Sequence, residues 1–156
     1  MEAKVRLVRV RRWERAAFMR MAERHFRELN PQFRPQADWA RGYFESIQEN
    51  PRYDLRWVHW GRRRVGFALF GLEPHRFLPR TSGMIYELYL LPAFRSRGLG
   101  TLCFAEILAC LKQKDIRRVQ LEVWSGNDRA AAFWCRLGFR GVATRYVLEL
   151  ADGARS

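Results

Sequence analysis

The stretch IYELYLLPAFRSRGLGTL, residues 85–102, indicates a buried strand, a short basic loop and a helix that opens through two glycines. Gly98 and Gly100 stand where the helix should begin. Without side chains there, backbone N–H groups can come close to an anion, and a helix N-terminus favours negative charge. Arg95 and Arg97 add positive charge beside them. These residues therefore predict a phosphate-binding turn at the end of a strand.

Other glycine-rich phosphate motifs do not fit this turn. A dinucleotide-binding fingerprint needs a different glycine spacing and a carboxylate after the next strand, and a P-loop needs Gly-Lys-Ser/Thr. A helix that opens on glycine without binding any ligand is the competing interpretation of the short pattern. The strand before it and the helix after it favour the phosphate hypothesis.

Length and composition predict one globular domain. The 156 residues are 48% apolar, which is enough for a proper core and too apolar for a disordered chain. No apolar run approaches the ~20 residues needed to span a bilayer, so we expect no membrane partner, and the N-terminus has no signal-peptide core. Three cysteines without metal or redox spacing favour reduced thiols and a cytoplasmic location.

The net charge of +13 leaves a nucleic-acid or ribosomal partner open. A basic surface attracts anions of many kinds. The arginines are scattered, and their densest run, 62–64, falls in an expected hairpin turn. A solvated basic face is therefore the favoured interpretation, and no nucleic-acid-binding motif occurs.

Hydrophobic periodicity predicts an α/β fold of the α+β type, with a mixed central β-sheet flanked by helices on both faces. We expect strands at 5–10, 55–60, 65–72, 84–91 and 119–123, helices at 13–29, 38–48, 99–114 and 127–137, and a closing pair of strands after Phe139, the clearer at 145–150. The crossover over 84–123 implies a parallel pair, and the turn at Gly61 implies an antiparallel pair. Residues 1–150 form the expected single domain and 151–156 a frayed tail.

The pattern Arg95-x-x-Gly98-x-Gly100 after a strand resembles the acetyl-CoA signature of the GNAT superfamily of N-acetyltransferases. A second segment, with Asn127, Ala130 and the pair Gly138-Phe139, resembles the second motif of that family. The resemblance covers residues 84–150 and implies the same mixed sheet. It also implies an N-acetyltransferase that passes an acetyl group directly from acetyl-CoA to a primary amine in a ternary complex, without a metal.

The resemblance also implies which residues bind the cofactor. Backbone N–H groups would hold the pyrophosphate, and they belong to Arg95, Ser96, Arg97, Gly98, Leu99, Gly100 and Thr101. The backbone at Leu90 and Leu91 would pair with the pantetheine arm like an added strand, so that an N–H polarises the thioester oxygen. Asn127 would contact the cofactor.

Two residues are candidates for catalysis. Glu87 is the one ionisable side chain in the strand 84–91, and a lone carboxylate among apolar neighbours suits a general base. A structural Glu87 paired with an arginine is the alternative. Trp134 stands where the family usually has a tyrosine acid. An indole N–H can contact the thiol but cannot act as an acid, and simple packing is the other interpretation.

The acceptor is not identified by the sequence: a small-molecule or a peptide amine fits equally. The replacement at Trp134 also leaves open a non-catalytic acyl-CoA-binding sensor or interaction module. A homodimer is possible because dimers are frequent in the family. Three histidines, His25, His59 and His75, are weaker catalytic candidates and more often structural.

Overall fold

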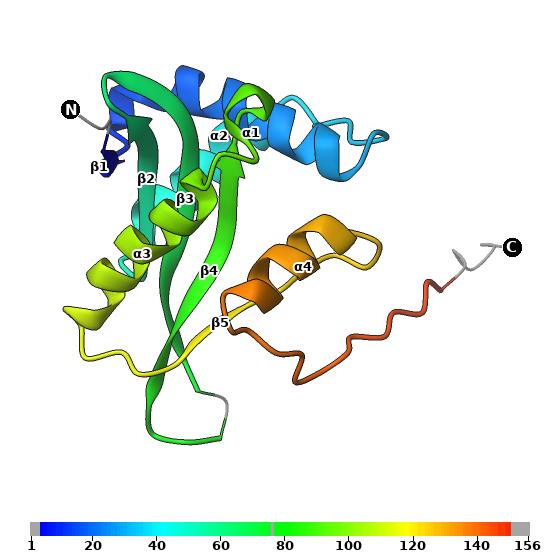
Figure 1. The fold of residues 1–156 in the computed structure, drawn as a ribbon. Coiled ribbons are helices and arrows are strands. Elements are labelled where there is room, and N and C mark those ends of the chain that lie inside the picture. The colour runs from blue at the N-terminus through cyan, green and yellow to red at the C-terminus, as the bar shows by residue number, and fades with distance from the viewer. Residues whose placement is uncertain (1–3, 76, 151–156) are drawn as a thin grey trace, which may run out of the picture. The chain divides into compact units, whose positions relative to one another are not determined.

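The computed structural model describes residues 4–75 and 77–150. Figure 1 shows a sheet with helices on it, followed by a last helix and an extended C-terminal segment. The elements in chain order are β1 (Val5–Arg9), η1 (Arg12–Glu14), α1 (Arg15–Leu29), α2 (Trp39–Glu49), β2 (Tyr53–Trp60), β3 (Arg63–Pro74), β4 (Thr81–Leu90), η2 (Pro92–Phe94), α3 (Leu99–Lys112), β5 (Val119–Leu121) and α4 (Asp128–Arg136). These bounds match the expected helices and the first five strands closely.

The chain divides into two compact units, Met1–Glu122 and Val123–Ser156. The first unit contains the whole sheet with α1, α2 and α3, and the second contains α4. Each unit is described by itself below. The single domain over residues 1–150 stays a prediction.

The sheet has five strands in the order β1-β2-β3-β4-β5. The first three pairs are antiparallel and β4 pairs with β5 in parallel, which confirms the mixed sheet. The parallel pairing is short, because residues 83–85 of β4 face 119–121 of β5 and the register goes no further. Beyond Ile85, the outer edge of β4 therefore has no pairing strand among the described residues of the first unit.

One face of the sheet is covered by α1 and α2. Apolar residues of these helices, Phe18 and Phe44 among them, pack in one buried cluster with Trp57 of β2 and Phe67 of β3. The ring of Phe18 meets those of Trp57 and Phe67 edge to face, at centroid distances of 6.1 and 5.1 Å. Aromatic pairs of this geometry add to the stabilisation that burial provides.

The opposite face is covered by α3. Its buried residues Cys103, Ile107 and Leu111 recur at four-residue spacing, so they form one stripe along the helix. A Cβ added at Gly83 of β4 would lie 2.8 Å from the Leu111 side chain, which shows how closely α3 lies on the sheet. Since side chains alternate between the faces of a strand, β3 is buried on both and is the central strand that its apolar run predicts.

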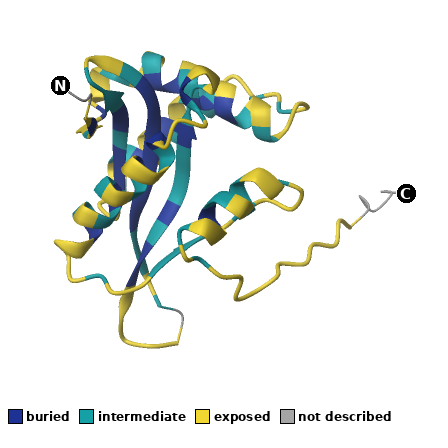
Figure 2. Ribbon diagram, in the orientation of Figure 1, coloured by how far each residue is buried: buried dark blue, intermediate teal, exposed yellow. Residues whose placement is uncertain are grey.

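The second unit corrects one expectation, because the closing pair of strands after Phe139 is absent from the described residues. Residues 140–150 are all exposed and carry no strand assignment, as Figure 2 shows in yellow. The alternation of 145–150 suits a strand, but a strand forms only where a neighbour completes its backbone hydrogen bonds. Within this unit, the described residues supply one helix and no neighbouring strand.

No helix among the described residues is long and apolar enough to cross a lipid bilayer. The three cysteines are free thiols. Cys103 is buried on the inner face of α3, Cys110 is half-buried and Cys135 is exposed. Burial raises the pKa of the Cys103 thiol to about 12. It is therefore a core residue, as its position on the helix predicts.

Candidate functional site

The start of α3 is a turn rich in unused backbone N–H groups. Gly98 precedes the helix in the left-handed region with φ 76°, and Ser96 is also left-handed with φ 58°. The first helical hydrogen bond runs from the N–H of Leu102 to the carbonyl of Gly98, so the amides of residues 99–101 precede the ladder. No side chain caps this end and its first turn has no acidic residue. The turn can therefore accept an anion.

Gly98 is required by its backbone angle rather than by lack of space. A Cβ added there would meet nothing within 4 Å, but an L side chain rarely adopts this φ. The sequence suggests that the missing side chain lets an anion approach. The structure adds that glycine is needed to turn the chain into the helix. Alternating left-handed residues are also the backbone pattern of anion-binding nests.

The end of β4 brings a backbone edge close to this turn. The N–H of Leu91 donates to the carbonyl of Val65 at 2.8 Å. Bonded and non-bonded pairs alternate in an antiparallel ladder, so the N–H of Leu90 points away from β3, toward the open edge. The carbonyl of Leu90 accepts from Nε of Arg95 at 2.8 Å. One donor at Leu90 thus faces the side where β4 has no strand.

Arg95 is held inside the first unit by three groups. Its side chain donates to the carbonyl of Leu90 and, at 2.6 Å, to Glu28 of α1. Its backbone N–H donates to the carbonyl of Pro92 at 3.2 Å. The hydroxyl of Tyr89 donates to the same Glu28 carboxylate at 2.7 Å. Glu28 therefore joins α1 to β4 and to the loop before α3.

The cluster around Glu28 shifts the pKa of two of its members. Burial, together with the hydrogen bond to the carboxylate, raises the pKa of Tyr89 to about 12. Burial alone would raise the pKa of Glu28, but the Tyr89 hydroxyl and the Arg95 guanidinium outweigh it and hold that pKa below its ordinary value. Glu28 is thus ionised and Tyr89 neutral at neutral pH. By contrast, the side chain of Arg97 is exposed in the same loop.

Glu87 does not stand alone among apolar groups. Its Oε2 lies 2.5 Å from Nε2 of His25 on α1, with the two side chains 22% and 10% exposed. The partner is a histidine and not the arginine of the alternative interpretation, so the pair has two groups that can each hold a proton. Glu87 also contributes, after burial, to a raised pKa of Tyr43 on α2. The pair sits between α1 and β4.

His25 is the functional candidate that sequence reasoning ranked too low. It lies on the buried face of α1 with Phe18 and Ala22, seven and three residues before it. Its ring centroid is 4.9 Å from that of Tyr89. A histidine in a helical apolar stripe needs a polar partner, and Glu87 was the available carboxylate on a neighbouring buried strand. That combination is a signal the sequence contains.

The remaining two candidates lie in the second unit. Asn127 caps α4, since its side-chain oxygen accepts from the N–H of Ala130 at 3.2 Å. Trp134 is buried and its ring meets those of Phe133 and Phe139 at centroid distances of 4.7 and 5.4 Å. Both residues therefore have structural roles in their own unit. Their contacts with a cofactor stay predictions.

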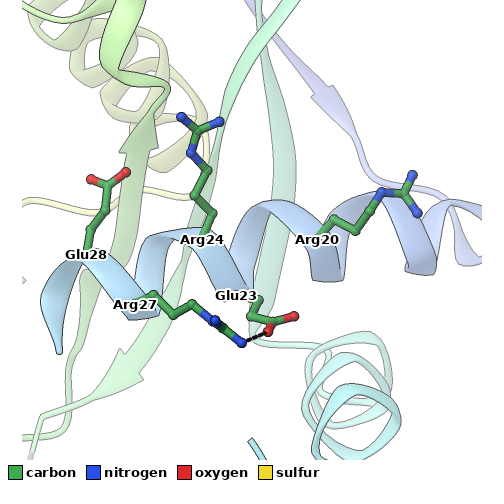
Figure 3. A pocket seen from close by; sticks show the side chains of 5 residues that line it. All are labelled: Arg20, Glu23, Arg24, Arg27 and Glu28. Atoms are coloured by element: carbon green, nitrogen blue, oxygen red, sulfur yellow. Dashed lines mark hydrogen bonds and ion pairs between the residues drawn. The ribbon is translucent and has the colours of Figure 1, made fainter. Parts of the chain in front are cut away.

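A shallow depression of about 440 Å³ lies on the outer surface of α1. Figure 3 shows its five charged side chains, Arg20, Glu23, Arg24, Arg27 and Glu28. Arg24 and Glu28 extend to one side of the helix, and Arg27 is bonded to Glu23 on another. The residues that the structure describes contain no group of three or more metal-binding side chains.

Comparison with known proteins agrees with this geometry. A family model described as Acetyltransferase (GNAT) family matches residues 8–139. An uncharacterized N-acetyltransferase of Methanocaldococcus jannaschii is 26% identical over 123 residues, covering 78% of this chain and 54% of the relative. The N-alpha-acetyltransferase RimI of Mycobacterium tuberculosis is 32% identical over 102 residues, covering 62% and 61%. The chain thus spans between about half and three fifths of these curated relatives.

A solved structure shows the same fold. An aminoglycoside N-acetyltransferase in complex with CoA superimposes with a TM-score of 0.71 at 15% identity, covering 99% of this chain and 98% of that one. Similarity at this level of identity concerns the arrangement of helices and strands.

Proposed function

The chain belongs to the GNAT family of acetyltransferases, and from this membership we propose that it transfers an acetyl group from acetyl-CoA to a primary amine. The transfer is direct, in a complex that holds both substrates. One observation carries the proposal. The backbone amides at the start of α3, which precede the helical hydrogen bonds, follow in sequence directly after the unpaired edge of β4.

The residues present fit coenzyme A. Amides of residues 96–101 are the donors that a pyrophosphate needs at a helix N-terminus, and Arg97 adds a positive charge exposed to solvent. The N–H of Leu90 is the donor for a pantetheine amide or the thioester oxygen. Arg95 plays a different part from its neighbours, because Glu28 and Leu90 already hold its side chain.

Acetyl-CoA would supply the acetyl group as a thioester. The amine nitrogen forms a bond to the acetyl carbon as the carbon–sulfur bond breaks, and coenzyme A leaves as a thiolate that takes up a proton from water. Glu87, supported by His25, receives the proton that the amine loses. Trp134 contributes at most an indole N–H to the thiol end. A thiolate with a pKa of roughly 8.5 leaves without an acid, so this substitution is compatible with transfer.

The acceptor class is a small-molecule or peptide amine. The relative from M. tuberculosis is named an N-alpha-acetyltransferase, and the protein of the CoA complex an aminoglycoside N-acetyltransferase. The non-catalytic sensor is not favoured, because these relatives are named as transferases. A homodimer stays a proposal.

Calorimetric titration with acetyl-CoA and coenzyme A tests the cofactor site. We expect binding by the wild type and its loss in a Gly98→Trp, Gly100→Trp double variant, because two large side chains would cover the amides. Gly42→Trp is the control: this glycine is exposed on α2 and a Cβ there meets nothing within 4 Å. Circular dichroism verifies that each variant is folded. A folded wild type that does not bind would overturn the proposal.

A further inference from the structure

The surface of α1 beside the proposed reacting pair carries more arginines than carboxylates, and the charge of Arg24 also acts on Glu28, one turn away. The depression there has three arginines and two glutamates in its lining. Glu23 is bonded to Arg27 at 2.5 Å, and Glu28 is bonded to Tyr89 and Arg95. Among the described residues, Arg20 and Arg24 form no ion pair with a carboxylate. Both are exposed and lie one helical turn apart, on one face.

This surface adjoins the proposed base. Arg24 and Glu28 lie one turn apart on α1, and Glu28 binds Tyr89, which shares a face of β4 with Glu87. Arg24 is also near enough to Tyr89 for its charge to oppose the rise of that phenol's pKa. A ligand whose amine reaches Glu87 can therefore place another group at Arg24 and Arg20.

The local acidic groups are already engaged. A polycationic acceptor would need free carboxylates near the amine site. Glu28 is held by Tyr89 and Arg95, and Asp54 is buried and held by both donors of Arg56, at 2.5 and 2.9 Å. Glu87 itself is paired with His25. Among the charged side chains that line the depression, the two without an ion pair are Arg20 and Arg24, and both are positive.

Resting on the proposed acetyltransfer, we infer that the acceptor is a small amine that carries a carboxylate or a similar anionic group, which Arg24 and Arg20 bind. A guanidinium binds a carboxylate or phosphate through two parallel hydrogen bonds, so it both attracts and orients such a group.

Thiol release with matched amines tests this inference. Leucine and methionine are compared with leucinamide and methioninamide, which have nearly the same shape but no carboxylate, and with spermidine as the polycation. We expect kcat/KM for the acids to exceed that for the amides roughly tenfold or more, since charged hydrogen bonds are the strong ones. Arg24→Gln should raise KM for the acids, leave kcat nearly unchanged and remove the preference.

The control variant is Arg117→Gln, which removes one charge from the exposed connection between α3 and β5. It should keep the preference of the wild type. Equal turnover of acids and amides, or faster turnover of spermidine, would overturn the inference while leaving the acetyltransfer intact.

A second measurement does not depend on turnover. Protein saturated with coenzyme A is titrated calorimetrically with leucine and with leucinamide. Binding of leucine that weakens in Arg24→Gln supports the anionic acceptor, and equal or absent binding of both ligands contradicts it. Failure of acetyl-CoA itself to bind would instead be the failure of the proposed function.

Discussion

At the scale of single residues, the proposed proton transfer depends on Glu87 and His25. The two side chains come from elements 62 residues apart in sequence and meet at 2.5 Å. Each side chain is mostly buried, so water cannot supply all of its hydrogen bonds. Each is instead the hydrogen-bond partner of the other. A carboxylate and an imidazole in contact are the kinds of side chain that remove a proton from an ammonium group.

Replacing Glu87 by Gln should lower kcat for acetyl transfer by roughly 10²–10⁴, the usual contribution of a general base. The affinity for acetyl-CoA should stay unchanged, because the proposed cofactor groups are backbone amides of other residues. Initial rates of thiol release and calorimetric titration measure the two effects separately. Glu45→Gln is the control, since this glutamate is exposed on α2. A folded Glu87→Gln protein with normal kcat would leave Glu87 a purely structural role.

At the scale of elements, local patterns predicted most of the fold. The strand, loop and helix of residues 85–102 are found as β4, η2 and α3, because glycine and alternating apolar residues act locally. What the sequence could not show is which side chains meet across elements. The tie from Glu28 to Tyr89 and Arg95 spans more than 60 residues and depends on the packing of α1 against the sheet.

The prediction of a closing pair of strands was wrong for a related reason. Residues 145–150 alternate like a strand, but a strand is stabilised by its neighbour rather than by its own pattern. No local signal tells whether that neighbour is present. For the same reason, the sequence identified the Glu87 carboxylate but not the histidine that pairs with it, and the role of Glu87 as a base stays a prediction.

Glu28→Gln tests how strongly α1 is tied to β4. At neutral pH we expect the free energy of unfolding to fall by about 1 kcal/mol, the worth of charge-assisted hydrogen bonds discounted because Glu28 is 34% exposed. The pKa of Glu28 is lowered in the folded protein, below its ordinary value of 4.5. Its stabilisation is therefore complete above pH 4.5 and is lost as pH falls through the folded pKa.

Denaturant unfolding at neutral and acidic pH measures this difference, which should shrink toward acid. Glu23→Gln provides a control on the same helix. Its pair with Arg27 is exposed, so its loss should lower the free energy of unfolding by only about 0.3 kcal/mol. A Glu28→Gln protein as stable as the wild type at neutral pH would show that the tie contributes no stability.

At the scale of the whole molecule, some of the arginines behind the net charge of +13 already contact other groups of the protein, so they are not free to bind a nucleic acid. Within the densest arginine run, Arg64 is paired with Glu14 and stacks over Trp57, with 3.9 Å from its guanidinium carbon to the ring centroid. Arg63 lies over the ring of Phe94 at 4.7 Å. These two arginines lie on β3 and contact side chains of neighbouring elements. They do not form a free basic stripe.

We therefore expect duplex nucleic acid to bind only at low salt. A protein that contacts about six phosphates of a duplex loses roughly 10³-fold in affinity between 50 and 200 mM salt, and at ~150 mM the Debye length is only about 8 Å. Fluorescence anisotropy with a labelled duplex should show binding in dilute buffer that disappears near ~150 mM salt. Acetyl-CoA carries few charges and should still bind there, because directed backbone amides hold it rather than a diffuse field. Duplex binding that persists at ~150 mM with a shallow salt dependence would mean that specific contacts exist, and the basic surface would then have a nucleic-acid partner.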